Sequence, residues 1–406
     1  MKFLVRIRLI AIAILLVVVS GAVSYRLGQK SVRLTAVGKA DLTMFWDVWS
    51  KLEANYLDKG AIDPQKMIYG AISGMTAALD DPYTSFFPPT ENSRSKEDLS
   101  GEFSGVGIQL GFVDKTLAVV APLPGNPAER AGIKAGDLIL HIKDEAKGLD
   151  KDTNGINLLD AVDYIRGRKG SSVTLTIFRE KDGQPKDYAL VRDTINVPSV
   201  ELTWVGPTSP AATKGAIAQL KVNRFGDKTL DEWNKAVSEV IIKAGRGVVL
   251  DLRNNPGGYL QRAIDLGSDF IPDGVIVQQQ GKDSLESFGV DRRGRLYGMP
   301  LVVLVNRGSA SAAEILAGAL AERLGAKLVG EKTFGKGTVQ EVLDLPGGAG
   351  VHITIAKWNL PSGKNIHKDG ITPDVVIEYV ADEKNPLKDN QLDKAIEVLT
   401  GNVAKK

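Results

Sequence analysis

Residues 301–314 read LVVLVNRGSASAAE. The apolar run Leu301–Val305 is typical of a buried strand, and residues 312–323 carry apolar side chains at helical spacing. A serine at such a strand-to-helix corner lies at the rim of a sheet, beside the free N–H groups of the helix start. Ser309 and Ser311 are therefore both candidates for a reactive hydroxyl, although either serine alone also suits a helix N-cap.

Lys336 stands between two glycines in the downstream sequence GKGTVQ, residues 335–340. Serine plus lysine can make a nucleophile without histidine. In an extended segment Lys336, Thr338 and Gln340 face the same way. Residues 330–337 also nearly match a phosphate-binding P-loop, but Gly337 takes the place of the required hydroxyl, and a strand-like pattern follows. We therefore rank nucleotide binding below the serine–lysine hypothesis.

The composition narrows the function classes. The 406 residues have room for two or three domains, and a net charge of +2 does not mark a nucleic-acid binder. Cysteine is absent, which excludes thiol nucleophiles, thiolate metal sites and disulfides. With three histidines, a histidine-rich metal site is disfavoured, and we expect no metal or cofactor.

The N-terminus predicts export. Lys2, Arg6 and Arg8 precede an uncharged run over residues 9–25, which is the pattern of a signal sequence. A full span needs about 20 apolar residues, so residues 1–25 are either a signal anchor or a cleaved signal peptide. We favour a single-pass anchor in the cell membrane, with the body outside the cytoplasm on the periplasmic or outer face.

Residues 38–92 are expected to form an N-terminal helical region, and residues 88–98 read as a charged linker. Within that linker, residues 93–96 match the S-x-x-K pattern of penicillin-binding enzymes. Neither S-D-N nor K-T-G accompanies it, so we interpret it as a chance match.

Short strands and turns fill residues 100–192. With G-V-G-I at residues 105–108 and A-G-I-K-A-G-D-L-I at residues 131–139, this segment resembles a PDZ domain. The resemblance implies a groove where a peptide C-terminus adds as an extra strand, at Gly105, Val106, Gly107 and Ile108. A plain β-rich structural domain is the alternative. Residues 150–155 imitate the start of a calcium loop but lack its acidic twelfth position, which favours a polar surface loop.

Strands and helices alternate over residues 198–380, which predicts an α/β core. Reactive residues of such cores collect at the C-terminal ends of strands. Both RNNPGG, residues 253–258, and the 309–312 stretch fall at such ends. Residues 381–406 are expected to form a C-terminal helical tail.

Several motifs together point to one family. They are DPYT (81–84), LRNNPGG (252–258), SASAAE (309–314), GKG (335–337), PSG (361–363) and GITPD (370–374). With them, the chain resembles a carboxyl-terminal processing protease, also called a tail-specific protease, from about residue 41 to 380. The resemblance implies an α/β protease core of the crotonase/ClpP-like type, with an inserted PDZ domain and N-terminal helices.

The same resemblance assigns residues. Ser311 would be the nucleophile, Lys336 its general base and Gln340 the residue that orients the lysine. The backbone N–H groups of Gly257 and Ala312 would form the oxyanion hole, and the position of Ala312 directly after the nucleophile supports its assignment.

The family's serine-to-lysine spacing selects Ser311 over Ser309, while Ala313 replaces a serine that the family motif often carries. The resemblance also implies that substrates carry apolar, unstructured C-termini and that tail binding to the PDZ domain gates the active site. Arg166 and Arg168 are candidates for that coupling. The lead-in helices and the tail helix are candidates for contacts in a homodimer.

Two other functions remain open from the sequence. One is a membrane-tethered adaptor that binds protein tails through the PDZ domain and carries an inactive body. The other is a crotonase-like acyl-CoA enzyme, which the PDZ domain and the exported N-terminus disfavour.

Overall fold

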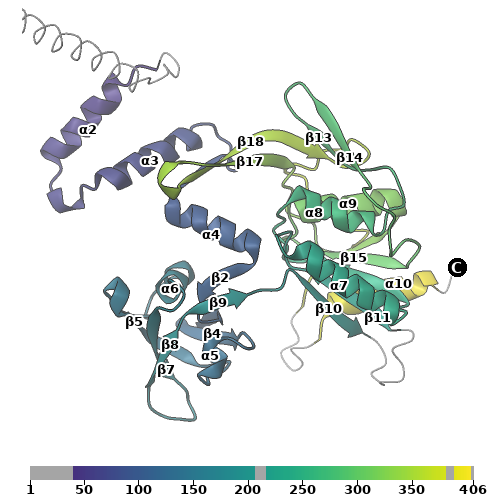
Figure 1. Cartoon of the computed structure of the whole chain (residues 1–406), viewed down its shortest axis with the longest axis horizontal. Helices are drawn as coiled ribbons and strands as arrows, with labels where there is room; N and C mark the ends of the chain where they lie inside the picture. Colours follow the sequence, from purple (N-terminus) through teal and green to yellow (C-terminus); the bar gives the residue numbers. More distant parts are fainter. Residues whose placement is uncertain (1–39, 206–215, 381–387, 404–406) are drawn as a thin grey trace, which may run out of the picture. The chain divides into compact units, whose positions relative to one another are not determined.

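The computed structural model describes residues 40–205, 216–380 and 388–403 (Figure 1). The chain divides into two compact units, Met1–Ala71 and Ile72–Lys406. No helix in the described ranges is long and apolar enough to cross a membrane. The predicted anchor, residues 1–25, lies outside the described residues.

The described part of the first unit is helical, as expected. It holds α2 (Thr43–Asn55), the short η1 (Lys59–Ala61) and the start of α3 (Pro64–Ala77), which continues into the second unit. None of the side chains of α2 is buried. Large apolar groups such as Met44, Trp46 and Leu52 are therefore exposed along this helix.

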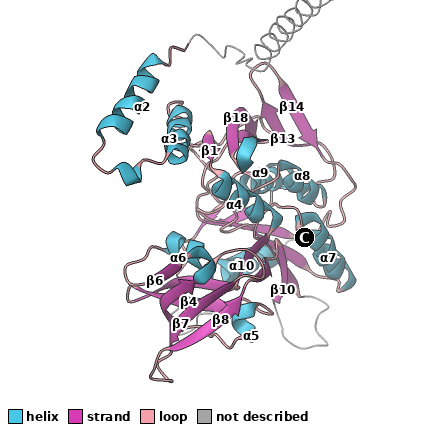
Figure 2. Cartoon of the chain, turned by 60° about the vertical axis from the view of Figure 1, so that its left-hand side comes forward, coloured by secondary structure: helices cyan, strands magenta, loops and turns pink. Residues whose placement is uncertain are grey.

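A β-rich module follows in the second unit. Its elements are β2 (Glu102–Gly105), β3 (Ile108–Val113), β4 (Thr116–Pro122), α5 (Pro127–Arg130), β5 (Leu138–Asp144), η2 (Glu145–Lys147), β6 (Leu149–Asp152), α6 (Leu158–Ile165), β7 (Ser172–Phe178), β8 (Lys186–Val191) and β9 (Asp193–Asn196). Five strands form an antiparallel sheet in the order β3-β4-β5-β7-β8, with β6 on β5, and β2 pairs with β9. Figure 2 shows these strands with α5 and α6.

Within this sheet β3 is an edge strand, because β4 is its only neighbour. The turn before β3 requires glycine: Gly107 has φ +74°, and a Cβ there would come within 2.4 Å of the Cβ of Asn126. An edge strand entered from a glycine turn, with α6 packed against it, is the arrangement that the peptide-binding hypothesis requires.

The α/β core is built on a six-stranded sheet. Its strands are β10 (Val200–Val205), β11 (Ile217–Val222), β12 (Gly247–Asp251), β15 (Leu301–Val305), β16 (Lys327–Gly330) and β19 (Val375–Val376), in that order. All neighbours run parallel except β10 and β11. The first prediction from the sequence, a buried strand over Leu301–Val305, is confirmed.

Helices cover both faces of this sheet. Alternate residues such as Val248 and Val303 pack with α7 (Thr229–Ile242), α8 (Leu260–Ser268) and α9 (Ala312–Leu324). The residues between them, such as Val249 and Val302, pack with α10 (Asn390–Val403) on the other face. A strand buried on both faces needs an unbroken apolar sequence, which explains VVL in β12 and LVVLV in β15.

A second, antiparallel sheet stands over the helices. It contains β1 (Ser85–Phe87), β18 (Gly350–Asn359), β13 (Val275–Gln280) and β14 (Leu285–Gly289), with β17 (Thr338–Asp344) on β18 and the short η3 (Pro346–Gly348) between β17 and β18. The strand β1 precedes the β-rich module in the sequence and pairs with β18, with Ser85 opposite His352. The chain therefore enters the core, leaves it for the β-rich module and returns.

Two expectations need correction. Residues 88–98 are not a linker but most of a helix, α4 (Pro89–Ser100), with proline in its first turn and Gly101 in the left-handed conformation at its C-cap. The helix also runs past residue 92, where the N-terminal helical region was expected to end. The helix of the C-terminal tail packs on the main sheet, where its Ala395 and Leu399 are buried, so it belongs to the core.

Candidate active site

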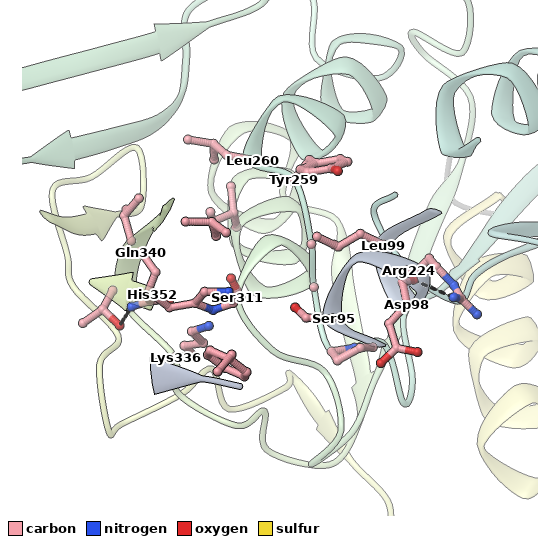
Figure 3. A pocket seen from close by; sticks show the side chains of 18 of the residues that line it. Ser95, Asp98, Leu99, Arg224, Tyr259, Leu260, Ser311, Lys336, Gln340 and His352 are labelled. Atoms are coloured by element: carbon pink, nitrogen blue, oxygen red, sulfur yellow. Dashed lines mark hydrogen bonds between the residues drawn. The ribbon is translucent and has the colours of Figure 1, made fainter. Parts of the chain in front are cut away.

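Ser311 lies at the corner between β15 and α9, at the N-cap of the helix. Its φ of +54° is rare for a residue other than glycine. The side chain borders a cavity of about 660 Å³ that Lys336, Gln340 and Gly257 also line. Figure 3 shows Ser311, His352 and Lys336 grouped together in this view of the cavity. The structure therefore brings the predicted nucleophile, base and orienting amide to one cavity.

Ser309 has a different environment. Its hydroxyl donates to the carbonyl oxygen of Leu252 at 2.8 Å and accepts from the backbone N–H of Asn306 at 2.9 Å. The residue is fully buried. These bonds join the chain after β12 to the chain after β15, so the hydroxyl of Ser309 serves the fold.

Lys336 enters the cavity from the loop between β16 and β17. Burial lowers the pKa of its amine below the ordinary value of 10.5, and the negative charge of Asp81 offsets part of this effect. The amine Nζ lies 5.2 Å from the centre of the Tyr83 ring, within the range of a cation–π contact. A lowered pKa raises the fraction of neutral amine, which is the form that can accept a proton.

Gln340 also lies on this wall, in β17. Its Nε2 donates to Thr338 Oγ1 at 2.9 Å and to Thr354 Oγ1 at 3.1 Å. Among the hydrogen bonds of the described residues, none joins Gln340 to Lys336. Both donor hydrogens of the amide are used, so its Oε1 is the atom that remains for the amine.

Gly257 packs directly on the serine corner. With φ +99°, an added Cβ would lie 2.8 Å from Ser311 Cβ and 3.1 Å from the backbone nitrogen of Ala312. Its N–H donates to Asn255 Oδ1 at 2.8 Å. Ala312 opens α9, where N–H groups have no intrahelical acceptor. Of the two predicted oxyanion donors, one therefore already has an acceptor within the protein.

Glu314 was not assigned a role from the sequence. Its buried carboxylate accepts from the backbone N–H groups of Ser311 and Lys336, each at 2.9 Å, through Oε2. Its Oε1 accepts from the N–H of Gly335 at 2.8 Å and from Thr333 Oγ1 at 2.5 Å. One carboxylate thus joins the serine corner to the lysine loop. The S-x-x-E spacing of a capping box indicates the first of these bonds, but no local pattern indicates the others.

His352 is a second residue that the sequence did not single out. It lines the cavity from β18, and Figure 3 shows its ring pointing toward Ser311. Burial, together with the nearby charge of Lys336, lowers the pKa of the imidazole. Its Nε2 is buried and has no hydrogen-bond partner within the described part of the chain. The imidazole is therefore neutral near pH 7 and adds no charge beside the lysine.

Apolar side chains form another part of the cavity wall, from α8, α9 and both strands of the β17–β18 hairpin. They are Leu260, Ile315, Val339, Val342 and Trp358. The helix α4 contributes polar groups, among them Arg94, Ser95 and Asp98. Within the S-x-x-K match, the lysine, Lys96, pairs with Asp344 at 2.6 Å instead of with a serine, and the match therefore forms no site of its own.

The predicted peptide-binding residues lie in the module, away from the residues that line this cavity. Gly105 ends β2, Val106 is buried and Ile108 begins the edge strand β3. The carbonyl oxygens of Val106 and Gly107 are already bonded, to the N–H groups of Ala128 and Leu123. The turn is thereby held rigid next to the free edge of β3.

The two arginines proposed for coupling differ. Arg166 follows α6, lies 3.7 Å from Glu97 of α4 and stacks over the Phe103 ring at 4.3 Å. A second pair, Arg94 and Asp163, joins α4 to α6 at 2.5 Å. Arg168 is exposed, and its guanidinium has no partner among the described residues.

Two alternative ligand sites lose support. The strand β17, and not a helix, follows Lys336, so residues 330–337 lack the helix N-terminus of a P-loop, and the nucleotide hypothesis is wrong. Residues 150–152 form part of β6, and Asp150 pairs with His141 at 2.8 Å. Within the described ranges no group of three or more His, Asp or Glu side chains could hold a metal ion.

Comparisons with known proteins agree with this geometry. Residues 216–377 match the model of peptidase family S41, and residues 119–179 match that of the PDZ domain. The chain is 36% identical to the carboxy-terminal processing protease CtpA of Bacillus subtilis (strain 168), covering 89% of this chain and 74% of the relative. It is 36% identical to a carboxyl-terminal-processing protease of Synechocystis sp., covering 92% and 86%.

Solved structures give the same result. The photosystem II D1 C-terminal processing protease is similar with a TM-score of 0.51 at 30% identity, over 84% of this chain and 94% of that one. A putative S41 protease from Bacteroides fragilis shares the fold with a TM-score of 0.55 at 16% identity, over 87% and 96%. The chain thus belongs to peptidase family S41, as a carboxyl-terminal processing serine protease that carries a PDZ domain.

Proposed function

We propose that this protease cleaves proteins near apolar C-termini, with Ser311 as nucleophile and Lys336 as general base. One observation carries the proposal. The hydroxyl of Ser309 is used by the fold, whereas Ser311 shares a cavity with a half-buried lysine whose pKa is lowered. A serine with a neutral amine beside it is a known catalytic pair.

In the proposed reaction, Ser311 Oγ attacks the scissile carbonyl carbon while Lys336 Nζ takes the hydroxyl proton. The tetrahedral intermediate collapses to an acyl-enzyme, and the ammonium returns the proton to the leaving amine. A water molecule then attacks the acyl carbon, with Lys336 again accepting a proton, which releases the acid and restores the serine. Gln340 would hold the amine in line.

The oxyanion of each intermediate would be stabilised by the N–H groups of Ala312 and Gly257. Support comes from the contact of Gly257 with the serine corner. The N–H of Gly257 already donates to Asn255 Oδ1. During the reaction it would either donate to both Asn255 and the oxyanion or give up its bond to Asn255.

Substrate recognition would begin at the module. A protein tail adding to the free edge of β3 would gain backbone hydrogen bonds, and its carboxylate would meet the N–H groups of the turn formed by Gly105, Val106 and Gly107. The apolar wall of the catalytic cavity suits apolar residues near the cleavage site.

Tail binding would also gate catalysis, and α4 is the element that suits this role. The helix lines the catalytic cavity and pairs with α6 through Arg94–Asp163 and Glu97–Arg166. A tail that docks between β3 and α6 would act on these pairs and so on the cavity wall. Arg168, exposed near the same end of α6, is a further candidate contact.

We further propose the cellular setting. Residues 1–25 would anchor the chain in the membrane with its catalytic body outside the cytoplasm. Two copies would pair through the apolar side chains of α2, a helix in which no residue is buried. The core would be related to the crotonase/ClpP-like folds, to which its β-α alternation is similar.

The decisive experiment compares two serine variants on a protein substrate with an apolar C-terminal tail. Ser311→Ala should abolish cleavage while tail binding, measured by fluorescence anisotropy, stays at the wild-type level. Ser309→Ala should keep cleavage and lower the melting temperature, because two buried hydrogen bonds are lost. Cleavage by Ser311→Ala would overturn the proposed nucleophile. Tail binding by a wild-type chain that never cleaves would instead support the adaptor hypothesis.

A further inference from the structure

The DPYT segment, residues 81–84, lies directly behind the catalytic cavity, and no role has been assigned to it so far. Asp81 is half-buried. Its Oδ1 accepts from the backbone N–H of Tyr83 at 3.0 Å, and its Oδ2 accepts from Thr84 Oγ1 at 2.8 Å. The side chain of Thr354 in β18 lies near the same carboxylate and lowers its pKa.

Thr354 connects this carboxylate to the catalytic wall. Its Oγ1 accepts from Gln340 Nε2 at 3.1 Å. Its backbone N–H donates to Thr84 Oγ1 at 3.0 Å, and the same hydroxyl donates to Asp81. Hydrogen bonds therefore connect Asp81 through Thr84 to Thr354, and the side chain of Thr354 to Gln340.

The direction of these hydrogen bonds is determined by their carboxylate end. An ionised carboxylate can only accept hydrogen bonds, and a hydroxyl has a single hydrogen to donate. Thr84 gives its hydrogen to Asp81, so it can only accept from the backbone N–H of Thr354, and this bond holds Thr354 in place beside Gln340. The ionised form of Asp81 is the stable one here: burial would raise the pKa of its carboxyl, but the side chain of Thr354 and the hydrogen bonds from Tyr83 and Thr84 outweigh that effect and lower it.

The amide of Gln340 is thereby oriented. Its NH₂ group faces Thr354 and Thr338, and its Oε1 is left on the other side. A lysine amine donates hydrogens in both its protonation states, so it needs an acceptor and not a second NH₂ group. The wrong amide orientation would place donor against donor beside Lys336.

We propose that Asp81 is a positioning residue of the catalytic site, which acts through Thr84 and Thr354 to fix Gln340 with its Oε1 available to the Lys336 amine. The ring of Tyr83, in the same segment, lies 5.2 Å from the amine nitrogen. This inference rests on the proposed roles of Lys336 and Gln340. It makes the N-terminal DPYT segment part of the catalytic apparatus.

The first test replaces one hydroxyl in the full-length enzyme. Thr354→Val keeps the shape of the side chain and removes the link, so we expect kcat to fall about 10- to 100-fold, as for a lost hydrogen bond in a charged network, with KM within twofold. Thr354→Ser keeps the hydroxyl and is the matched control, with kcat within threefold of wild type. A Thr354→Val enzyme as active as the serine variant would overturn the proposal.

A double-mutant cycle separates this inference from the proposed role of Gln340. If Thr354 acts through Gln340, then Gln340→Ala lowers kcat, and adding Thr354→Val to it costs little more. Independent, multiplicative losses contradict the inference alone. A Gln340→Ala enzyme with wild-type kcat contradicts both the inference and the role of Gln340.

The pH profile gives a readout that a purely structural role would not move. Asp81, His352 and the ring of Tyr83 interact with the Lys336 amine, while Glu314 and His367 act on Tyr83 and on Asp81. Asp81→Asn removes the carboxylate that raises the pKa of Lys336, so the acidic limb of kcat should move to lower pH as kcat falls. Thr354→Val leaves the carboxylate in place and should not move the limb. A shift in neither variant, or an equal shift in both, is inconsistent with the proposal.

Discussion

Replacing Glu314 by glutamine tests how the serine corner and the lysine loop are held together. The carboxylate accepts four hydrogen bonds, two on each oxygen, and glutamine offers only one oxygen. If its NH₂ group faced Ser311 and Lys336, two backbone N–H groups would lose their acceptor. If it faced Gly335 and Thr333, the hydroxyl of Thr333 could turn and accept a hydrogen bond from the NH₂ group, and only the N–H of Gly335 would lose its acceptor. The second orientation costs less free energy and should be adopted.

The loss in the free energy of unfolding follows from that orientation. One buried N–H without an acceptor costs about 1–3 kcal/mol, and each of the two bonds that keep an oxygen weakens by about 1 kcal/mol when the acceptor loses its charge. The free energy of unfolding should therefore fall by about 3–5 kcal/mol. Because the lost bond belongs to Gly335, the residue before Lys336, the proposed general base, kcat should fall at least tenfold.

Urea unfolding and steady-state cleavage of a tailed peptide measure the two effects. Glu322→Gln is the matched control, since Glu322 lies on the same helix but is exposed, and it should keep kcat within twofold of wild type. If Glu314→Gln unfolds and cleaves like Glu322→Gln, the carboxylate does not hold the two segments together.

Three further predictions follow from the same site and from the packing around it. Burial lowers the pKa of Lys336 and the proposed reaction needs its neutral amine, so kcat should rise with pH and level off below 10.5, whereas Lys336→Ala should show no such limb. Gly257→Ala should abolish cleavage, because its Cβ would lie 2.8 Å from the Cβ of Ser311, the proposed nucleophile, at φ +99°; Gly74→Ala, with no atom within 4 Å, should remain fully active. Leu399→Ala should lower the free energy of unfolding by about 2–5 kcal/mol in urea titrations, because α10 packs on the main sheet through this side chain; an unchanged midpoint would contradict that packing.

Much of this fold could be predicted from local patterns. Runs such as LVVLV bury on both faces, glycine turns mark the entry to β3, and proline marks the start of α3, so these elements were found from the sequence. The helix α4 was missed because its residues are mostly polar and two prolines, Pro88 and Pro89, stand at its start. Its signals, proline in the first turn and glycine after the last residue, were present but suited a linker equally well.

The residues of the candidate site also differ in how far the sequence could predict their roles. Ser311 and Lys336 could be proposed from motifs and spacing. The role of Ser309 could not, because it depends on the carbonyl oxygen of Leu252, which only the parallel pairing of β12 and β15 brings near. The same holds for the four bonds of Glu314, which join residues up to 22 positions apart. Sequence patterns indicate residue types, whereas the direction of a hydrogen bond requires the partners' positions.

The pairing of β1 with β18 has a consequence for the order of events at the ribosome. The hydrogen bond from Thr354 to Thr84 joins residues 270 positions apart. The DPYT segment is therefore synthesised long before its partner strand β18, which is among the last strands to be made. Contacts of such long range form late in folding. A growing chain would therefore hold a serine, a lysine and a glutamine that are not yet aligned, and would become a protease only after nearly all of it has been synthesised. That delay would protect the ribosome and nearby proteins from proteolysis during synthesis.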